Sequence, residues 1–359
     1  MEPVMEFEAF CREHGSFMQS PSWADVKPGW IPERVTVRRG GRIVGAMLIL
    51  VRPLPLLKTA FLYAPRGPVC NLHDRKVLAE LLDRALDVAE SYHAFGMKID
   101  PLIDEDDDAA IRNLTALGFR WAPDKVGYDN IQCRENYVLD LRGKTPEDLL
   151  AGFDPKCRYN IRLAGRRGVT CGFYGEERLN DFMALMRTTA ERDGFAARSR
   201  EYFAGLLRSF RGQARLCMTY LDGEPLSGAL CIEYAGTMSY VYGCSSNEHR
   251  DCMPNYLMQW TMIRRACEEG MTTYDFCGVP YWYDTQHKNY GVYRFKSGFR
   301  GSVKTWAGEF DYTLRPVLQY IFNAAWFLKK RVLCRIAGHS AQRRYAAVKT
   351  KIVPGRGLA

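Results

Sequence analysis

Residues 35–50 read VTVRRGGRIVGAMLIL, residues 218–232 read MTYLDGEPLSGALCI, and the two stretches share one pattern. In each, a strand-like run reaches a glycine, Gly40 or Gly223, and a Gly-Ala pair with a second apolar run follows after four intervening residues. Two such runs joined by a glycine turn are typical of a β-hairpin. The sequence therefore predicts two hairpins of matching design.

The same further elements follow each hairpin. A third strand is expected at residues 62–64 in the first copy and at residues 240–242 in the second. Apolar residues at helical spacing then predict one helix at about residues 75–92 and another at about residues 255–269. The two halves of the chain thus repeat one order of elements.

The ends of the two predicted helices also match. Each helix stops near a glycine, Gly96 or Gly270, and we expect both glycines to act as C-terminal caps. A methionine and a strand follow each glycine, and the strands lead to Asp100 and Asp275. Chance similarity of two ordinary hairpins explains this shared order less well than an internal duplication does.

Hairpin, strand, helix and strand, present twice, predict an α/β (α+β) fold, and the order resembles two GNAT-type acyltransferase domains in tandem. We expect a first domain at residues 1–138 completed by the segment 311–335, a second domain at residues 139–310, and a basic tail at residues 336–359. A helix should begin after Thr145, because threonine can cap it and the following proline suits a first turn. No long heptad segment is present, so no coiled-coil arm is expected.

Composition excludes several classes of protein. The 359 residues, 47% of them hydrophobic, suffice for two cores, and no apolar run reaches the roughly 20 residues of a membrane span. The acidic N-terminus MEPVMEFEAFCREHG lacks the features of a signal peptide, so a cytoplasmic location is expected. The 12 cysteines form no CxxC pair, and we expect them to be reduced, buried thiols. The 6 histidines are isolated from one another in the sequence. We expect neither a metal nor a cofactor.

The positive charge is concentrated at the C-terminal end. From Tyr312 onward there is no Asp or Glu, and there are ten Lys and Arg residues. Their summed positive charge is slightly larger than the net charge of +9 of the whole chain, so the rest of the chain is almost neutral. Such a block is typical of an arm that contacts phosphates, either of nucleic acid or of an anionic membrane surface. The sequence favours the membrane slightly, because Trp326 and Phe327 lie beside a basic cluster. A docked helix is an equally good interpretation of the apolar residues that precede the cluster.

The most distinctive stretch is YDFCGVPYWYDTQHKNYGVYRFKSGFRGSVKTWAGEFD, residues 274–311. Its Tyr-Asp-Phe-x-Gly, Phe-Lys-x-x-Phe-x-Gly and Gly-Glu-Phe-Asp motifs resemble those of the Fem family. Further family-like stretches occur in the same order as in the family, at residues 17–27, 63–68, 158–162, 191–202 and 240–246. The resemblance covers nearly the whole chain up to Asp311.

The resemblance implies an aminoacyltransferase of peptidoglycan synthesis. Such an enzyme transfers an amino acid from aminoacyl-tRNA to the side-chain amine of the stem peptide, which builds the interpeptide bridge. The acceptor is a peptidoglycan precursor, either UDP-MurNAc-pentapeptide or lipid II. The expected location is the cytoplasm, with possible peripheral contact between the basic tail and the inner face of the membrane.

The family motif places Lys296 near the transferred acyl group and Phe295 in the wall of the acceptor site. An ammonium suits this position, because it offers three donors and a full charge to the oxyanion that develops during acyl transfer. A surface lysine on a strand is the alternative interpretation of Lys296, and a core position is the alternative for Phe295.

The resemblance assigns precursor binding to Lys27, Arg198, Tyr202, Tyr240 and Tyr242. Arginine and lysine suit the phosphates and carboxylates of the precursor. Arg198 and Tyr202 lie four residues apart and would share one face of a helix, whereas Tyr240 and Tyr242 alternate on a strand and should point the same way. Core packing is the alternative for the tyrosines.

Two regions leave the assignment open. After Pro101, where some family members place a substrate-contacting tyrosine, this chain has Leu102 and an acidic run. Arg158, Arg162 and Arg166 recur every four residues, a basic stripe that could meet tRNA phosphates or form a solvated helix face. The alternative functions are a GNAT-like N-acyltransferase with another acyl donor and a non-catalytic protein that binds tRNA or membrane. The segment 245–254 lacks the glycine-rich turn of acyl-CoA sites, which argues against acyl-CoA.

Overall fold

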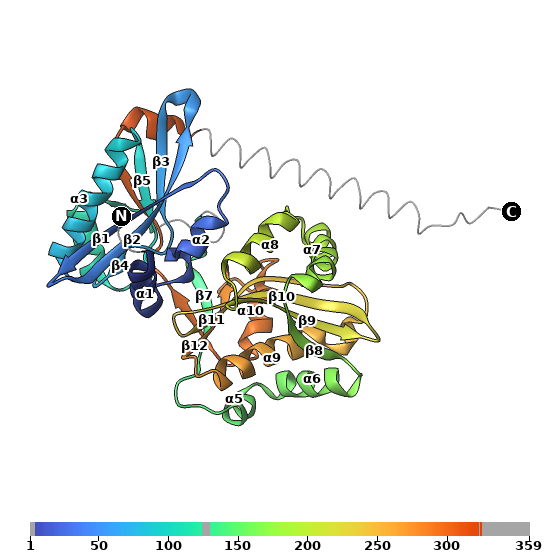
Figure 1. Cartoon of the computed structure of the whole chain (residues 1–359). Coiled ribbons are helices and arrows are strands. Elements are labelled where there is room, and N and C mark those ends of the chain that lie inside the picture. Colours follow the sequence, from blue (N-terminus) through green and yellow to red (C-terminus); the bar gives the residue numbers. More distant parts are fainter. Residues whose placement is uncertain (1–3, 124–129, 323, 325–359) are drawn as a thin grey trace.

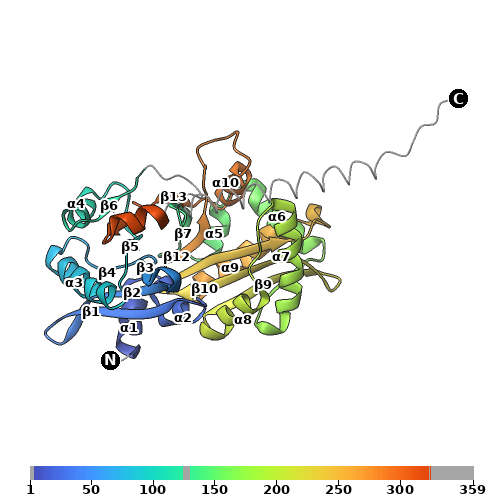
Figure 2. The same ribbon diagram turned by 90° about the horizontal axis from the view of Figure 1, so that it is seen from above.

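The computed structural model describes residues 4–123, 130–322 and 324, and these residues form two α/β units that lie side by side (Figures 1 and 2). The predicted basic tail at residues 336–359 and its membrane or RNA contact lie outside the described residues. No helix in the described part of the chain has both the length and the apolarity needed to cross a bilayer.

The first unit is built on a sheet with the strand order β1-β2-β3-β5-β14-β6, and β4 pairs with β2. Its strands are β1 (Ile31–Arg39), β2 (Arg42–Leu54), β3 (Thr59–Ala64), β4 (Val69–Cys70), β5 (Gly96–Ile99), β6 (Arg120–Trp121) and β14 (Phe310–Thr313). Its helices are α1 (Val4–His14), η1 (Phe17–Gln19), α2 (Pro21–Asp25), η2 (Pro55–Leu57), α3 (Arg75–Ser91) and α4 (Asp108–Ala116).

The second unit is built on a sheet with the strand order β13-β7-β12-β11-β10-β9-β8. Its strands are β7 (Glu135–Asp140), β8 (Thr170–Tyr174), β9 (Ala214–Leu221), β10 (Glu224–Tyr234), β11 (Thr237–Ser245), β12 (Thr273–Gly278) and β13 (Ser302–Thr305). Its helices are α5 (Pro146–Gly152), α6 (Pro155–Arg166), η4 (Glu176–Arg178), α7 (Leu179–Asp193), α8 (Arg200–Ser209), η5 (Arg250–Cys252), α9 (Pro254–Glu268) and α10 (Tyr290–Ser297).

The two sheets have the same internal order, which confirms the predicted tandem α/β fold. In both, an antiparallel hairpin and a third antiparallel strand lead to a parallel strand, as β3 pairs with β5 and β11 with β12. An antiparallel strand from elsewhere in the chain then extends each sheet, β14 beside β5 and β7 beside β12. In each sheet, therefore, the parallel strand pairs with a strand that lies far from it in the sequence. No coiled-coil arm is present among the residues that the structure describes.

The exact domain boundaries stay a prediction. Strand β14 lies in the first sheet, and residues beyond it pack there too, since Leu318 and Phe322 contact Phe61 and Phe95. The expected boundary between residues 138 and 139 falls within β7, whose partners β12 and β13 both belong to the second sheet.

Most local predictions agree with the helices observed. The predicted helix after Thr145 is α5, and Thr145 and Asp148 cap it reciprocally. The prediction that Gly96 caps a helix was wrong, because α3 ends at Ser91 and Gly96 is already the first residue of β5. His93 takes the left-handed conformation at the turn, with φ of 50°. By contrast, Gly270 follows Glu269, the C-cap of α9, and has φ of 71°.

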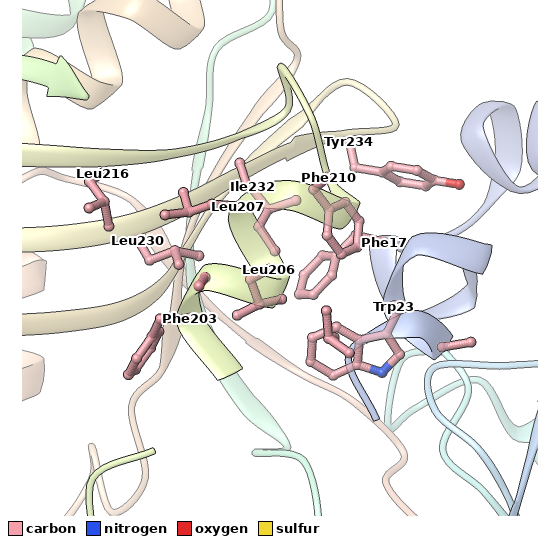
Figure 3. Close-up of a cluster of buried hydrophobic side chains, with 14 of the residues drawn as sticks. Phe17, Trp23, Phe203, Leu206, Leu207, Phe210, Leu216, Leu230, Ile232 and Tyr234 are labelled. Carbon is pink, nitrogen blue, oxygen red and sulfur yellow. The ribbon is translucent and has the colours of Figure 1, made fainter. Parts of the chain in front are cut away.

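The two units share an apolar core (Figure 3). Phe17 and Trp23, from η1 and α2 of the first unit, are buried against α8 of the second. The ring of Phe17 lies 6.1 Å from that of Phe210 and 5.3 Å from that of Trp23. Burying large aromatic side chains is the main source of free energy for such a contact, so the segment that follows α2 is held firmly beside α8.

Candidate functional site

A cavity of about 2620 Å³ lies between the two units and is lined by residues from both. Four of the predicted binding residues line this cavity, namely Lys27, Arg198, Tyr202 and Tyr242. Leu102, at the position where the sequence departs from the family pattern, also lines it. Clefts between domains are a common place for substrate sites, so this cavity is the candidate site.

The cavity wall contains a cluster of cationic and aromatic side chains, the Lys27 cluster, formed by Trp23, Lys27, Arg198, Tyr202 and Tyr242. The Lys27 ammonium lies 3.5 Å from the ring centroid of Trp23 and donates a hydrogen bond of 3.4 Å to the Tyr202 hydroxyl. That hydroxyl lies 3.1 Å from the hydroxyl of Tyr242. The Arg198 guanidinium lies 5.4 Å from the centroid of the Tyr202 ring. The structure thus brings together four of the predicted binding residues from three separate segments.

The environment of Lys27 favours its neutral form. Burial lowers the pKa of Lys27 to about 7, and the nearby positive charge of Arg198 contributes to the same shift. An anion bound beside the two cations would offset the repulsion between them, so the pair suits an anionic group such as a phosphate or a carboxylate.

Arg198 does not lie on the helix that was predicted to carry it. Ser199 is the N-cap of α8, and its side chain accepts a hydrogen bond from the backbone N–H of Tyr202. Arg198 therefore precedes the helix, and it reaches Tyr202 from the connecting segment. Serine is a preferred N-cap residue, so Ser199 could have shown this from the sequence.

The prediction that Tyr240 and Tyr242 point the same way was also wrong. Between them the register of β11 shifts, since Tyr242 pairs with Leu230 but Tyr240 pairs with the adjacent Cys231. The extra residue, Val241, forms a β-bulge, which reverses the alternation of side chains. Tyr242 consequently packs on the α8 side of the sheet, whereas Tyr240 packs in the core on the opposite side.

Lys296 lies on α10 and is buried, not on a surface strand. Its ammonium donates hydrogen bonds to three main-chain oxygens, those of Phe276 (2.6 Å), Cys277 (3.3 Å) and Gly278 (2.8 Å). Cys277 and Gly278 line the cavity. Burial lowers the pKa of Lys296, while nearby Cys277 and Asp275 oppose that shift. The lysine therefore holds the end of β12 in place from behind the cavity wall.

Asp275 fixes the same strand end from its cavity side. One carboxylate oxygen accepts a hydrogen bond of 2.7 Å from the Cys277 backbone N–H, and the other accepts one of 2.9 Å from the Asn136 side-chain amide. This arrangement keeps Cys277 in a left-handed conformation with φ of 59°. Burial raises the pKa of Asp275. A strand end held from two sides is rigid, which suits a site that must orient reacting groups.

Phe295 contacts other aromatic residues of the second unit. Its ring lies 5.0 Å from that of Tyr256 and 5.7 Å from that of Phe299. These contacts belong to the core beneath α10, and the residues that line the interdomain cavity do not include Phe295 or Tyr240. Their predicted roles toward substrate stay predictions.

The first unit contributes a buried carboxylate that the sequence interpretation did not assign to the site. Asp100 accepts hydrogen bonds from the Tyr63 hydroxyl (2.9 Å) and from the Arg66 backbone N–H (2.6 Å). Burial raises the pKa of Asp100 to about 6. The Arg66 guanidinium donates to the carbonyl of Cys133 in the chain that leads to the second unit. Tyr63 and Arg66 line the cavity directly.

A signal for Asp100 and Asp275 was present in the sequence. Both follow the Gly-Met step in the two copies of the repeat, so their shared position at the parallel strand marks them as a pair. Among the described residues, no group of His, Cys, Asp and Glu side chains is arranged to hold a metal ion.

The comparison with known proteins agrees with this geometry. Residues 3–225 match the model of the FemAB family, and residues 155–297 match an acetyltransferase (GNAT) domain. The chain is 32% identical to the Lipid II:glycine glycyltransferase of Staphylococcus aureus (strain USA300), over 88% of this chain and 93% of that protein. The chain belongs to the FemAB family.

Solved structures support the same assignment for this FemAB protein. The crystal structure of FemX superposes with a TM-score of 0.84 at 30% identity and covers 89% of this chain and 98% of that one. A tandem GNAT protein from the clavulanic acid biosynthesis pathway has a TM-score of 0.53 at 14% identity, with 87% and 95% covered. The second likeness concerns the fold alone, and both agree with two GNAT-like units in one FemAB chain.

Proposed function

We propose that this FemAB protein transfers an amino acid from aminoacyl-tRNA to the stem-peptide side-chain amine of a lipid-linked peptidoglycan precursor. The observation that carries the proposal is the interdomain cavity, which joins the Lys27 cluster to the strand end held by Lys296. The Lys27 cluster suits an anionic precursor, and the strand end held by Lys296 suits acyl transfer. The 32% identity to a Lipid II:glycine glycyltransferase supports this choice of acceptor.

The proposed reaction forms an amide and releases tRNA. The neutral amine of the acceptor attacks the acyl carbon of the aminoacyl ester, and the carbonyl oxygen becomes an oxyanion. The oxyanion then collapses, the bond to the ribose oxygen breaks, and that oxygen takes the proton that the amine nitrogen loses. The protein supplies orientation and charge for this sequence.

Lys296 is the residue that we assign to the oxyanion. All three of its donors already meet main-chain oxygens, so an oxyanion must replace one of them. The Cys277 oxygen, at 3.3 Å, has the longest of the three bonds and is the partner most easily exchanged. Asp275 and Gly278, which lie beside Cys277 in the cavity wall, would keep their positions during that exchange.

We assign the tRNA to the exposed face of α6, which begins beside the helix that carries Lys296. The backbone N–H of Asp154 donates to the Gly298 carbonyl at the end of α10, at 2.9 Å. From there Tyr159, Arg162 and Arg166 are exposed along α6, and the Arg166 guanidinium lies 5.6 Å from the Tyr159 ring centroid. Cations interleaved with an aromatic ring suit the phosphates and bases of an RNA end.

Charge reversal on α6 should weaken donor binding. In the Arg162→Glu/Arg166→Glu variant we expect the KM for charged tRNA to rise on the order of tenfold, because two phosphate contacts are replaced by repulsion. The salt dependence of the KM should become shallower, and the KM for the acceptor should stay unchanged. An Arg42→Glu/Arg112→Glu variant, with the same change of charge on the first unit, is the control. Equal losses in both variants would contradict a specific site on α6.

Acceptor affinity should fall as the pH rises through the pKa of Lys27. Lys27 is charged below its pKa of about 7 and neutral above it, so the attraction for an anionic precursor is strongest at lower pH. We expect acceptor affinity, measured by calorimetry, to decrease above pH about 7. In Lys27→Arg the cation stays charged, and the step near neutral pH should vanish. Identical pH profiles for the two proteins would contradict the assignment.

A transfer assay tests the proposed function as a whole. The purified protein is supplied with a panel of charged tRNAs or with acyl-CoA, and with UDP-MurNAc-pentapeptide or lipid II, and the products are identified by mass spectrometry. We expect transfer from a charged tRNA to lipid II. Transfer from acyl-CoA alone would favour a GNAT-like acyltransferase, although Pro254 removes one backbone donor from the start of α9, where such a cofactor would need it.

A further inference from the structure

Five large apolar side chains are exposed at one end of the first unit. Leu56 is 100% exposed and Leu57 is 53% exposed in the turn between β2 and β3. Val317, Tyr320 and Ile321 are 72%, 76% and 50% exposed on the helical residues 316–322. Figure 1 shows the two segments at the same upper end of the unit. We call these five residues the apolar tip.

The two segments of the apolar tip are anchored by a core of their own. On the inner face of residues 316–322, the Phe322 ring lies 5.2 Å from Phe61 and 5.0 Å from Phe95. Leu54, the residue directly before η2, packs in the same core. The exposed side chains are therefore presented by fixed backbone, and their exposure is not the result of a loose segment. Clustered apolar exposure of this kind marks an interaction surface.

The apolar tip borders the interdomain cavity. Leu54 at the base of the turn lines the cavity, and so do Gln319 and Phe322 of the helical segment. A substrate that enters beside these residues would pass along the tip before it reaches the Lys27 cluster.

Positive charges flank the apolar tip. Lys58 follows Leu57 in the turn, Arg315 precedes the helical segment, and both are exposed. Exposed leucines with a tyrosine and flanking basic residues are the composition that binds an anionic bilayer, because the apolar side chains enter it and the cations meet the lipid head groups.

We propose that the apolar tip binds the surface of an anionic membrane and so turns the opening of the cavity toward a lipid-linked acceptor. This inference rests on the proposed function. Membrane binding by the tip would explain how a precursor anchored in the bilayer reaches a cavity in a protein that lies beside the bilayer. It concerns the folded first unit, and it is separate from any contact made by the basic tail.

Vesicles of mixed phosphatidylcholine and phosphatidylglycerol test the proposal with the full chain. We expect Leu56→Ser/Leu57→Ser to weaken vesicle binding by at least about tenfold, because two leucines no longer leave water. The control is Val4→Ser/Met5→Ser, which removes two exposed apolar residues from α1 and should bind like the parent protein. Vesicles of phosphatidylcholine alone separate the apolar contribution from the electrostatic one.

Activity assays keep this test separate from the proposed function. The Leu56→Ser/Leu57→Ser variant should transfer normally to UDP-MurNAc-pentapeptide, or to whichever water-soluble acceptor the parent protein uses, and should lose transfer to lipid II in vesicles. Equal vesicle binding by the variant and the parent would overturn the membrane proposal, and so would a parent protein that binds no vesicles. If the parent protein is a dimer and the variant is a monomer, the tip would instead be assigned to contact with a second copy of the chain. A parent protein that transfers an amino acid to none of these acceptors would overturn the proposed function itself.

Discussion

Replacing Lys296 by methionine is expected to lower kcat about 100-fold or more, the usual scale for removal of an oxyanion donor. Methionine keeps much of the apolar stem and removes the charge and all three donors. The carbonyls of Phe276, Cys277 and Gly278 would lose their shared partner. Single-turnover transfer from charged tRNA measures the loss in the chemical step.

Two further measurements separate chemistry from folding in the Lys296→Met variant. Acceptor affinity, measured by calorimetry, should change little, because Lys296 donates its hydrogen bonds to the end of β12, whereas Lys27 and Tyr202 are held by contacts of their own. Thermal unfolding shows whether the loss of this donor from three carbonyls destabilises the second unit. Near-parental turnover in a folded variant would be incompatible with our assignment of Lys296.

Replacing Arg198 by alanine is expected to raise the KM for the acceptor by roughly 10- to 100-fold, since a hydrogen bond to a charged group contributes about 1.5–3 kcal/mol. Arg198 stands over the Tyr202 ring beside Lys27, where it can hold a phosphate or carboxylate. The KM for charged tRNA should hardly change. Steady-state kinetics with each substrate varied in turn make the measurement.

Arg200→Ala is the matched control. Arg200 lies two residues away and is also exposed, but it donates to the Asn180 side chain at 3.2 Å and does not line the cavity. Its removal should leave both KM values near those of the parent. An Arg198→Ala variant that lost affinity for tRNA and kept affinity for the acceptor would place this residue on the donor side of the reaction.

Local patterns in the sequence were enough to predict the two hairpins, the helices that follow them and the helix capped by Thr145. These elements depend on neighbouring residues, because apolar spacing, glycine turns and capping side chains act over a few positions. The repeated order of the elements also predicted the tandem fold. The family motifs led to Lys27, Tyr202 and Lys296 through resemblance, without showing how they lie.

The arrangement of the site depended on contacts between residues far apart in the chain. Strand β14 completes the first sheet after the whole second unit has been made, a pairing that no local pattern encodes. The bulge at Val241 places the side chains of Tyr240 and Tyr242 on opposite faces of the sheet. This bulge depends on the register between β11 and β10, which no local pattern sets.

The sequence by itself therefore determined the elements, their repeated order and the family. Only the tertiary structure decided that Lys27 meets Tyr202 across the interface between the units, and that Lys296 turns its three donors to the end of β12. The physical reason is that the aromatic core formed by Phe17, Trp23 and α8 sets the distance between the units. Burial of that core, summed over residues from both units, has no signature in any one stretch of the chain.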